Sequence, residues 1–195
     1  CDTRIMDGGE IDAGNARFAG QEAMVVFDDA FIPWERVFMD GEHEFAAMLV
    51  ERFTCYHRRS YVCKSGVGDV LIGAAAAIAD YNGVEKASHV RDKLAEMAHL
   101  VETMYSGALA CSYECSTLGC GTAIVDPLLA NSAKFNTARY YPEVTRLAQD
   151  IAGGFLATMP SERELANPRV AHFVRKYYQT RPDVPAEDRL RLGRL

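Results

Sequence analysis

The chain has 195 residues, of which 49% are hydrophobic and 25% are charged, and its formal net charge is −6. This composition is ordinary for a globular protein, and the negative charge argues against nucleic-acid binding. No apolar run reaches the roughly 18 residues that a membrane-spanning helix needs, so we expect no membrane partner.

The first 40 residues predict β structure. Residues 22–27 form a short apolar run that contains β-forming side chains, and Pro33 cannot continue a strand. We therefore expect residues 1–40 to be the last strands of a β-domain. Because the chain starts at Cys1 without a leading Met, we interpret it as a fragment of a longer polypeptide that lacks its N-terminal part.

Residues 41–195 predict an up-and-down helix bundle. We expect helices over residues 42–53 and 68–81, the second ended by Asn82 and Gly83. Asp126 and Pro127 begin another helix as cap and first-turn proline, Pro142 is expected to kink it, and the glycine pair 153–154 to end it. A capping box at residues 161–164 and a last helix near residue 185 complete the predicted elements.

One apolar stripe with alternating steps of four and three defines the clearest helix. Its members are Val90, Leu94, Met97, Val101, Met104, Ala108, Cys111 and Cys115. The spacing of Cys111 and Cys115 would allow shared metal ligation, but their place on this stripe favours a core role. The six cysteines of a chain this long, with no visible export signal, indicate free thiols and a cytoplasmic location.

The stretch from His57 to Lys64 concentrates chemically active groups. It holds an imidazole, a phenol at Tyr61, a thiol at Cys63 and an amine, directly before a glycine-rich segment. An imidazole and a thiol are metal ligands, and a phenol and an amine are acid/base or electrostatic groups. Two ligands are too few for a closed metal site. A helix start with a buried cysteine and a surface histidine is the alternative.

Two further positions are candidates. Glu22 is a carboxylate in an apolar run, where it either faces solvent or lies in a pocket with a raised pKa. Gln149 and Asp150 precede Gly153 and Gly154 at a predicted helix end, where glycines allow close approach of a ligand. A plain helix stop is the alternative for this second segment.

Several of these segments resemble the 4-hydroxyphenylacetate 3-hydroxylase family of flavoproteins. Residues 25–38 are similar to a signature of the whole family. Residues 56–58, 63–74, 146–154 and 159–161 are similar, more specifically, to its 4-hydroxybutyryl-CoA dehydratase branch. The resemblance extends from about residue 12 onward and implies an acyl-CoA dehydrogenase type of architecture. Residues 1–40 would then be the end of a β-barrel, and residues 41–195 most of the C-terminal helix bundle.

The resemblance also implies cofactors and roles. Members of that branch carry FAD and a [4Fe-4S] cluster held by three Cys and one His, which His57 and Cys63 match in part. Glu22, Tyr61, Lys64 and His57 match active-site residues. Gln149, Asp150, Gly153 and Gly154 match a segment that contributes to FAD binding across a subunit interface of a homotetramer.

The implied reaction is dehydration of 4-hydroxybutyryl-CoA to crotonyl-CoA, with vinylacetyl-CoA isomerase activity. In that branch it proceeds by a flavin radical mechanism in which the cluster acts as Lewis acid. Two alternatives remain at this point. One is a reduced-flavin-dependent aromatic 3-monooxygenase of the same wider family, and the other is a helical assembly fragment without activity of its own.

Overall fold

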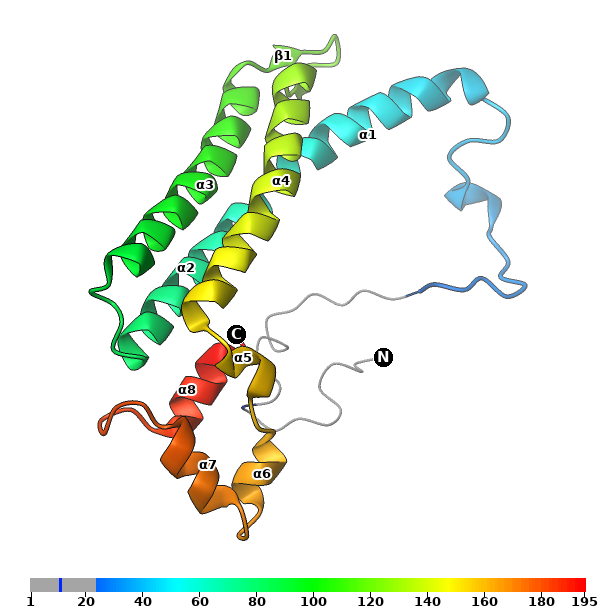
Figure 1. Ribbon diagram of the computed structural model, residues 1–195. Coiled ribbons are helices and arrows are strands. Elements are labelled where there is room, and N and C mark those ends of the chain that lie inside the picture. Colours follow the sequence, from blue (N-terminus) through cyan, green and yellow to red (C-terminus); the bar gives the residue numbers. More distant parts are fainter. Residues whose placement is uncertain (1–10, 12–23) are drawn as a thin grey trace.

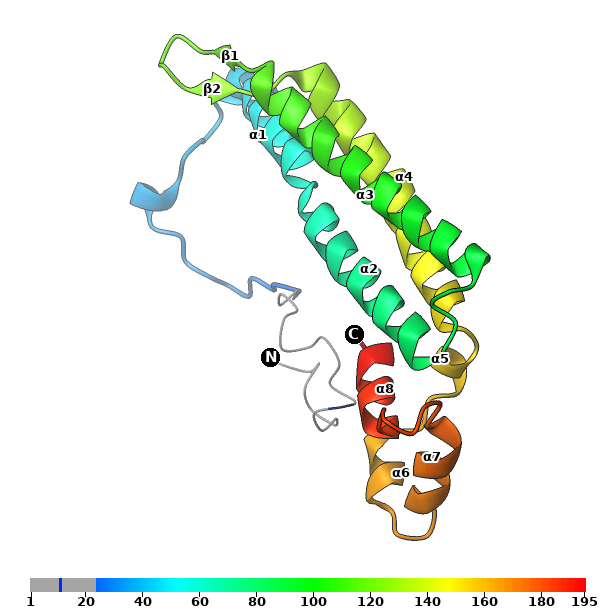
Figure 2. The same cartoon turned by 90° about the vertical axis from the view of Figure 1, so that its left-hand side faces the viewer.

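A computed structural model of the chain describes residue 11 and residues 24–195. Three long helices, α2 (Cys63–Tyr81), α3 (Ser88–Tyr113) and α4 (Pro127–Ala152), lie side by side with alternating direction (Figures 1 and 2). Helix α1 (Ala46–Ser60) leads into α2 and contacts α4. The expected mainly helical bundle is confirmed.

The core lies between α2, α3 and α4. Met97 and Met104 of α3 are fully buried against Ile78 of α2 and Val144 of α4. The apolar stripe of α3 faces this core, as its spacing predicted, because residues three and four apart share one face of a helix. Burial of such side chains contributes about 1.5–3 kcal/mol each, so packing, rather than local propensity, holds the long helices together.

The helix ends agree with the capping residues. Asp126 accepts a hydrogen bond at 2.7 Å from the backbone N–H of Leu129 at the start of α4. Helix α2 ends at Asn82, followed by Gly83 with φ +71°, and α4 ends at Gly153 with φ +81°. Both glycines adopt left-handed conformations that other residues rarely tolerate.

The first two helices are longer than the sequence predicted. The predicted break over residues 54–67 is reduced to Tyr61 and Val62, since α1 extends to Ser60 and α2 starts at Cys63. Residues 54–65 contain no glycine or proline to interrupt a helix, and Gly66 and Gly68 are accommodated because tertiary packing offsets their low helix propensity.

Helix α4 continues through Pro142 to Ala152, and the kink expected at that proline stays a prediction. One other expectation for the long helices needs correction. Helix α3 ends at Tyr113, so Cys115 lies beyond it and is exposed instead of in the core. A short antiparallel hairpin of β1 (Ser116–Thr117) and β2 (Ala123–Ile124) follows, because a turn over residues 118–122 redirects the chain.

The described part of the predicted strand over residues 22–27 does not form a strand. Glu22 and Ala23 lie outside the described residues, and residues 24–27 have no strand partner. A strand requires the backbone groups of a neighbour, and the sheet formed within the described residues contains β1 and β2 alone. Short 3₁₀ turns, η3 (Trp34–Arg36) and η4 (His43–Phe45), connect this segment to α1. The division at residue 40 remains a prediction.

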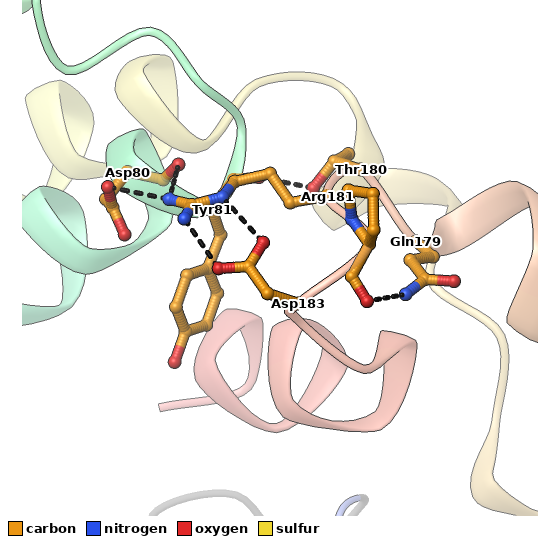
Figure 3. Close-up of polar contacts among 7 residues, drawn as sticks. Asp80, Tyr81, Gln179, Thr180, Arg181 and Asp183 are labelled. Atoms are coloured by element: carbon orange, nitrogen blue, oxygen red, sulfur yellow. Dashed lines mark hydrogen bonds and ion pairs between the residues drawn. The ribbon is translucent and has the colours of Figure 1, made fainter.

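Four short helices follow the bundle. They are α5 (Phe155–Thr158), α6 (Glu162–Ala166), α7 (Ala171–Tyr178) and α8 (Ala186–Gly193), with the predicted capping box present at Ser161 and Glu164. The loop between α7 and α8 is joined to the end of α2 by an ion pair and hydrogen bonds (Figure 3). Arg181 reaches Asp80 at 2.9 Å and Asp183 at 2.7 Å, and the Thr180 hydroxyl donates to the Tyr81 carbonyl.

The near-continuous helix over His43–Tyr81 is long and apolar enough, by length and composition, to cross a membrane, and a window of 18 residues within it has a mean hydropathy of 1.5. The sequence predicted no membrane-spanning helix, and the difference arises because α1 and α2 are nearly continuous instead of separated by residues 54–67. The same test is passed by core helices of soluble proteins. In this chain, Ala75, Ile78 and Ala79 of that helix are buried in the bundle.

Candidate functional site

The stretch from His57 to Lys64 forms the junction between α1 and α2. The last turn of α1 carries His57, Arg58 and Arg59, where positive charge is favourable beside the carbonyl end of a helix. The N–H of Tyr61 donates to the carbonyl of His57 at 3.2 Å and closes the helix. The junction therefore presents several chemically active side chains within one tight turn of backbone.

His57 lies between two aromatic rings. Its imidazole stacks on Phe53, with centroids 5.7 Å apart and planes at 15°, and meets the edge of Tyr61 at 5.4 Å and 71°. Phe53, His57 and Tyr61 are spaced by four residues, so they occupy one face. His57 itself is exposed beside these two rings, so the structure presents an imidazole oriented by aromatic neighbours at the surface of the chain.

Helix α4 contributes to the same junction. Lys134 Nζ lies 4.6 Å from the ring centroid of Tyr61, and Lys64 Nζ lies 5.2 Å from the ring centroid of Tyr141. Both arrangements are within the range of cation–π attraction. Lys134 and Tyr141 were not identified from the sequence. They are two turns apart on one face of α4, but only the packing of α4 on the junction connects them to it.

Cys63 is the first residue of α2, and its thiol is exposed and free. Imidazole and thiolate donors suit iron, so His57 and Cys63 fit part of an iron–sulfur site. Among the residues that the structure describes, no group of three or more His, Cys, Asp or Glu could hold a metal ion. A metal site here would need ligands from outside the described residues, so the metal-ligand role of His57 and Cys63 stays a prediction.

The remaining candidate thiols differ in environment. Cys111 is fully buried, burial raises the pKa of its thiol, and its Sγ donates to the Ala108 carbonyl at 3.2 Å. A protonated, buried thiol behaves as a small apolar side chain. Cys115 is exposed, as noted above. Glu22 lies outside the described residues.

The 149–154 segment forms the end of α4. Gly153 donates to the carbonyl of Gln149 at 2.9 Å, and a Cβ added at Gly153 or Gly154 would meet nothing within 4 Å. Asp150 pairs with Lys93 of α3 at 2.7 Å, and the Lys93 hydrogen bond lowers the pKa of its carboxyl group. Open glycine backbone next to an accessible amide can accept a flat ligand, so this segment fits a flavin contact.

An apolar cavity of about 240 Å³ adjoins this segment. It is bounded by α2, α4, α5 and α8, with Leu71 and Ile78 on one side, Ala152 and Leu156 on another, and Gln149 as one of its few polar groups. The cavity provides space for an apolar ring edge beside an amide. This is the usual composition of a small-molecule pocket.

The two candidate regions are separate within one chain. His57, Tyr61 and Cys63 lie at the start of α2, whereas the 149–154 segment lies next to Asn82 at its end (Figure 1). The rise of about 1.5 Å per residue places the two ends of α2 roughly 28 Å apart. A single copy therefore does not combine both regions into one site.

The family model described as "4-hydroxyphenylacetate 3-hydroxylase C terminal" matches residues 46–195, and its N-terminal counterpart matches residues 1–39. The whole chain is 51% identical to a 4-hydroxybutyryl-CoA dehydratase/vinylacetyl-CoA-Delta-isomerase of Clostridium aminobutyricum, covering 42% of that protein. It is 26% identical, over 93% of its length, to the oxygenase component of a Thermus thermophilus 4-hydroxyphenylacetate 3-monooxygenase, covering 38% of that protein.

Among solved structures, too, a 4-hydroxybutyryl-CoA dehydratase is more similar to this chain than a 4-hydroxyphenylacetate 3-monooxygenase component is. An oxygen-tolerant archaeal 4-hydroxybutyryl-CoA dehydratase from N. maritimus superposes with a TM-score of 0.93 at 55% identity, over 100% of this chain and 39% of that one. A 4-hydroxyphenylacetate 3-monooxygenase oxygenase component complexed with FAD and 4-hydroxyphenylacetate superposes with a TM-score of 0.71 at 27% identity, over 87% and 36%. The chain spans about two fifths of the length of these relatives. With a family model matching most of its residues, the chain belongs to the 4-hydroxyphenylacetate 3-hydroxylase family.

Proposed function

We propose that the protein to which this chain belongs dehydrates 4-hydroxybutyryl-CoA to crotonyl-CoA and isomerises vinylacetyl-CoA. The observation that carries the proposal is the difference in similarity within the family. Identity is 51% to a dehydratase/isomerase but 26% to an aromatic oxygenase component, over nearly the same residues. An acyl-CoA thioester is accordingly the proposed substrate.

The chain's own residues take defined roles in this proposal. His57, an exposed imidazole held between Phe53 and Tyr61, is the base for the proton next to the thioester carbonyl when its ring is not bound to metal. Tyr61 donates a hydrogen bond to the substrate hydroxyl or thioester oxygen, and Lys64 stabilises negative charge nearby. Glu22, outside the described residues, is proposed to hold the substrate hydroxyl or thioester oxygen together with Tyr61.

Two cofactors are proposed, and each has contacts on this chain. When bound, FAD supplies one-electron redox chemistry and a [4Fe-4S] cluster supplies Lewis acidity. His57 and Cys63 would hold the cluster together with ligands from outside the described residues. Gln149, Asp150, Gly153 and Gly154 would contact the flavin. FAD is supported by related solved structures that contain it, whereas the cluster rests on the donor types at the junction of α1 and α2.

The two cofactor contacts lie at opposite ends of α2, which supports an assembly in which neighbouring copies complete each other's sites. Helix α1 also exposes large apolar side chains, and Cys55 is its one buried residue. The exposed set on α1 includes Met48, Leu49, Val50 and Phe53. Exposed apolar patches of this kind are typical of interaction surfaces. We propose a cytoplasmic homotetramer, which sedimentation of the complete protein would test.

One alternative retains support. The fold is shared with FAD-containing 4-hydroxyphenylacetate 3-monooxygenase components, so hydroxylation of a phenol by reduced flavin and oxygen remains the second candidate. That activity does not require the imidazole and thiol at the α1–α2 junction. A passive helical assembly role is the third candidate, and it predicts no turnover in any complex.

A single anaerobic preparation of the complete protein discriminates between these functions. We expect bound FAD, iron and acid-labile sulfide, and formation of crotonyl-CoA from 4-hydroxybutyryl-CoA. A protein with FAD but without iron, which hydroxylates 4-hydroxyphenylacetate in the presence of oxygen, would establish the second candidate instead. Absence of both activities in the cofactor-loaded protein would leave the assembly role.

A further inference from the structure

Arg189 of α8 is a buried charge to which the described residues offer no carboxylate partner. The residue is 8% exposed, and none of the ion pairs found among residues 24–195 includes it. Burial lowers the pKa of its guanidinium, but an arginine stays protonated in proteins. Burying a charge costs folding free energy unless its polar groups form hydrogen bonds. The hydrogen-bond partners of Arg189 therefore indicate the role of this buried charge.

Those partners come from three different elements. Nε donates to Asn82 Oδ1 at 2.9 Å at the end of α2, and an Nη donates to the Tyr178 carbonyl at 3.1 Å at the end of α7. The guanidinium carbon lies 4.0 Å from the ring centroid of Phe155 in α5. A planar guanidinium can stack on a ring and donate in its own plane at once, which an ammonium cannot do.

Asn82 extends the network to α4. Its Nδ2 donates a long hydrogen bond, 3.5 Å, to the Ala152 carbonyl, while its Oδ1 accepts from Arg189. Ala152 directly precedes the glycine pair, and Phe155 directly follows it. Arg189 thus holds both sides of Gly153 and Gly154, one through Asn82 and the other directly.

Close packing of α8 against α5 supports the placement of Arg189 on both sides of the glycine pair. A Cβ added at Gly193 of α8 would lie 2.7 Å from the Phe155 ring and 2.8 Å from Met159 Sδ. The loop before α8 is clasped to the end of α2 through Arg181 and Asp80 (Figure 3). Helix α8 is therefore packed closely against α5 and joined to the end of α2 through the preceding loop, which places Arg189 against the elements on both sides of the glycine pair.

We propose that Arg189 is a positioning residue that holds the 149–154 segment in its ligand-binding orientation. This inference rests on the proposed flavin contact of that segment. Two consecutive glycines have the largest backbone freedom, so they need outside constraints to present one fixed surface. The guanidinium supplies that constraint, and the cavity wall formed by Gln149 and Ala152 keeps its shape.

The test compares variants of the complete protein in two measurements. The first is the Kd for FAD, from quenching of flavin fluorescence on binding to the apoprotein. The second is hydrogen–deuterium exchange of the amides of residues 150–156. We expect Arg189→Leu to raise the Kd at least tenfold and to speed this exchange at least tenfold. Arg189→Lys should lie between Arg189→Leu and the unchanged protein.

Two further variants keep the test decisive. Asn82→Asp retains an acceptor for Arg189 but loses the donor to Ala152, so we expect a folded protein with a raised Kd and faster exchange of the segment. Val125→Ala removes a buried methyl pair from the cluster of Cys55, Cys111 and Ala130, which includes neither the segment nor Arg189's partners, and serves as a control for general destabilisation. It should leave both measurements unchanged.

Unchanged exchange and unchanged Kd in Arg189→Leu would overturn the proposal. If that variant does not fold, the same result in Asn82→Asp would overturn it. An equal effect of Val125→Ala would also overturn it, because the change would then follow stability alone. If the unchanged protein binds no FAD, the proposed flavin contact fails, whereas the exchange measurement still decides whether Arg189 holds the segment.

Discussion

The ammonium of Lys134 lies over the ring of Tyr61, with Nζ 4.6 Å from the ring centroid, and the edge of that ring meets the imidazole of His57. A residue of α4 thereby fixes the side chain that closes α1, beside the imidazole proposed as base. The contact connects the packing of the bundle to the orientation of the proposed catalytic groups.

Lys134→Met tests this connection. A methionine keeps the apolar stem but removes the cation, so we expect a stability loss of about 0.5–1 kcal/mol and a roughly tenfold lower kcat from a less ordered Tyr61. Lys176→Met is the matched control, since Lys176 lies 5.3 Å from the ring centroid of Tyr177 on α7. Equal kcat values for the two variants would show that Lys134 does not order the junction.

The proposed cluster ligands are tested by iron content. His57→Ala and Cys63→Ala should each lower iron per protomer and abolish dehydration, because each removes a donor. Cys115→Ala should keep its iron although its thiol is also exposed. Cys111→Ala should keep its iron and lose about 1 kcal/mol of stability, since it leaves a small cavity. Full iron occupancy in both His57→Ala and Cys63→Ala would exclude these two residues as ligands.

Two glycines of α2 should respond oppositely to alanine. A Cβ at Gly68 would lie 2.5 Å from Val101 Cγ2, so Gly68→Ala forces α2 and α3 apart and should cost about 1–3 kcal/mol. A Cβ at Gly66 meets nothing within 4 Å, so Gly66→Ala should stabilise by about 0.5–1 kcal/mol through helix propensity. Urea unfolding measures both.

Shortening Val101, the side chain that a Cβ at Gly68 would meet, tests whether this close contact causes the cost. In the Val101→Ala background, Gly68→Ala should cost clearly less than in the unchanged protein, because the two residues are in contact. An identical cost in both backgrounds would mean that the effect of Gly68→Ala does not arise from the approach of α2 to α3.

The Lys93–Asp150 pair predicts a pH dependence of stability. The hydrogen bond from Lys93 lowers the pKa of Asp150 in the folded state, below its ordinary value near 3.9. The pair therefore stabilises the fold above that ordinary value, and its contribution is lost as the pH falls through the lowered folded pKa. The carboxylate is half-exposed, so the effect should also weaken at high salt.

Asp150→Asn measures this contribution. The difference in unfolding free energy between the unchanged protein and the variant should be constant from pH 5 to 8 and vanish at strongly acidic pH. Lys93→Met should show the same pH dependence. A difference that persists unchanged down to pH 2 would exclude the ion pair as its source.

Local signals in the sequence predicted the helix ends well. The cap at Asp126, the box at Ser161 and Glu164, and the stops at Gly83 and Gly153 all depend on residues within about four positions of each other. The sequence predicted a helix break over residues 54–67, but the interruption covers only Tyr61 and Val62. The prediction was wrong because no glycine or proline in the sequence marks so short an interruption. The strand expected near residue 25 depended on pairing partners that a local pattern does not supply.

The sequence by itself determined the helical class, the stripe of α3, the caps, and the presence of an imidazole, a phenol and a thiol at one place in the chain. Only the tertiary structure decided that Lys134 meets Tyr61, that Arg189 brackets Gly153 and Gly154, and that Cys115 lies outside the core. Propensity and capping act between near neighbours in the chain. Contacts between helices depend on how whole faces pack, which no single segment specifies.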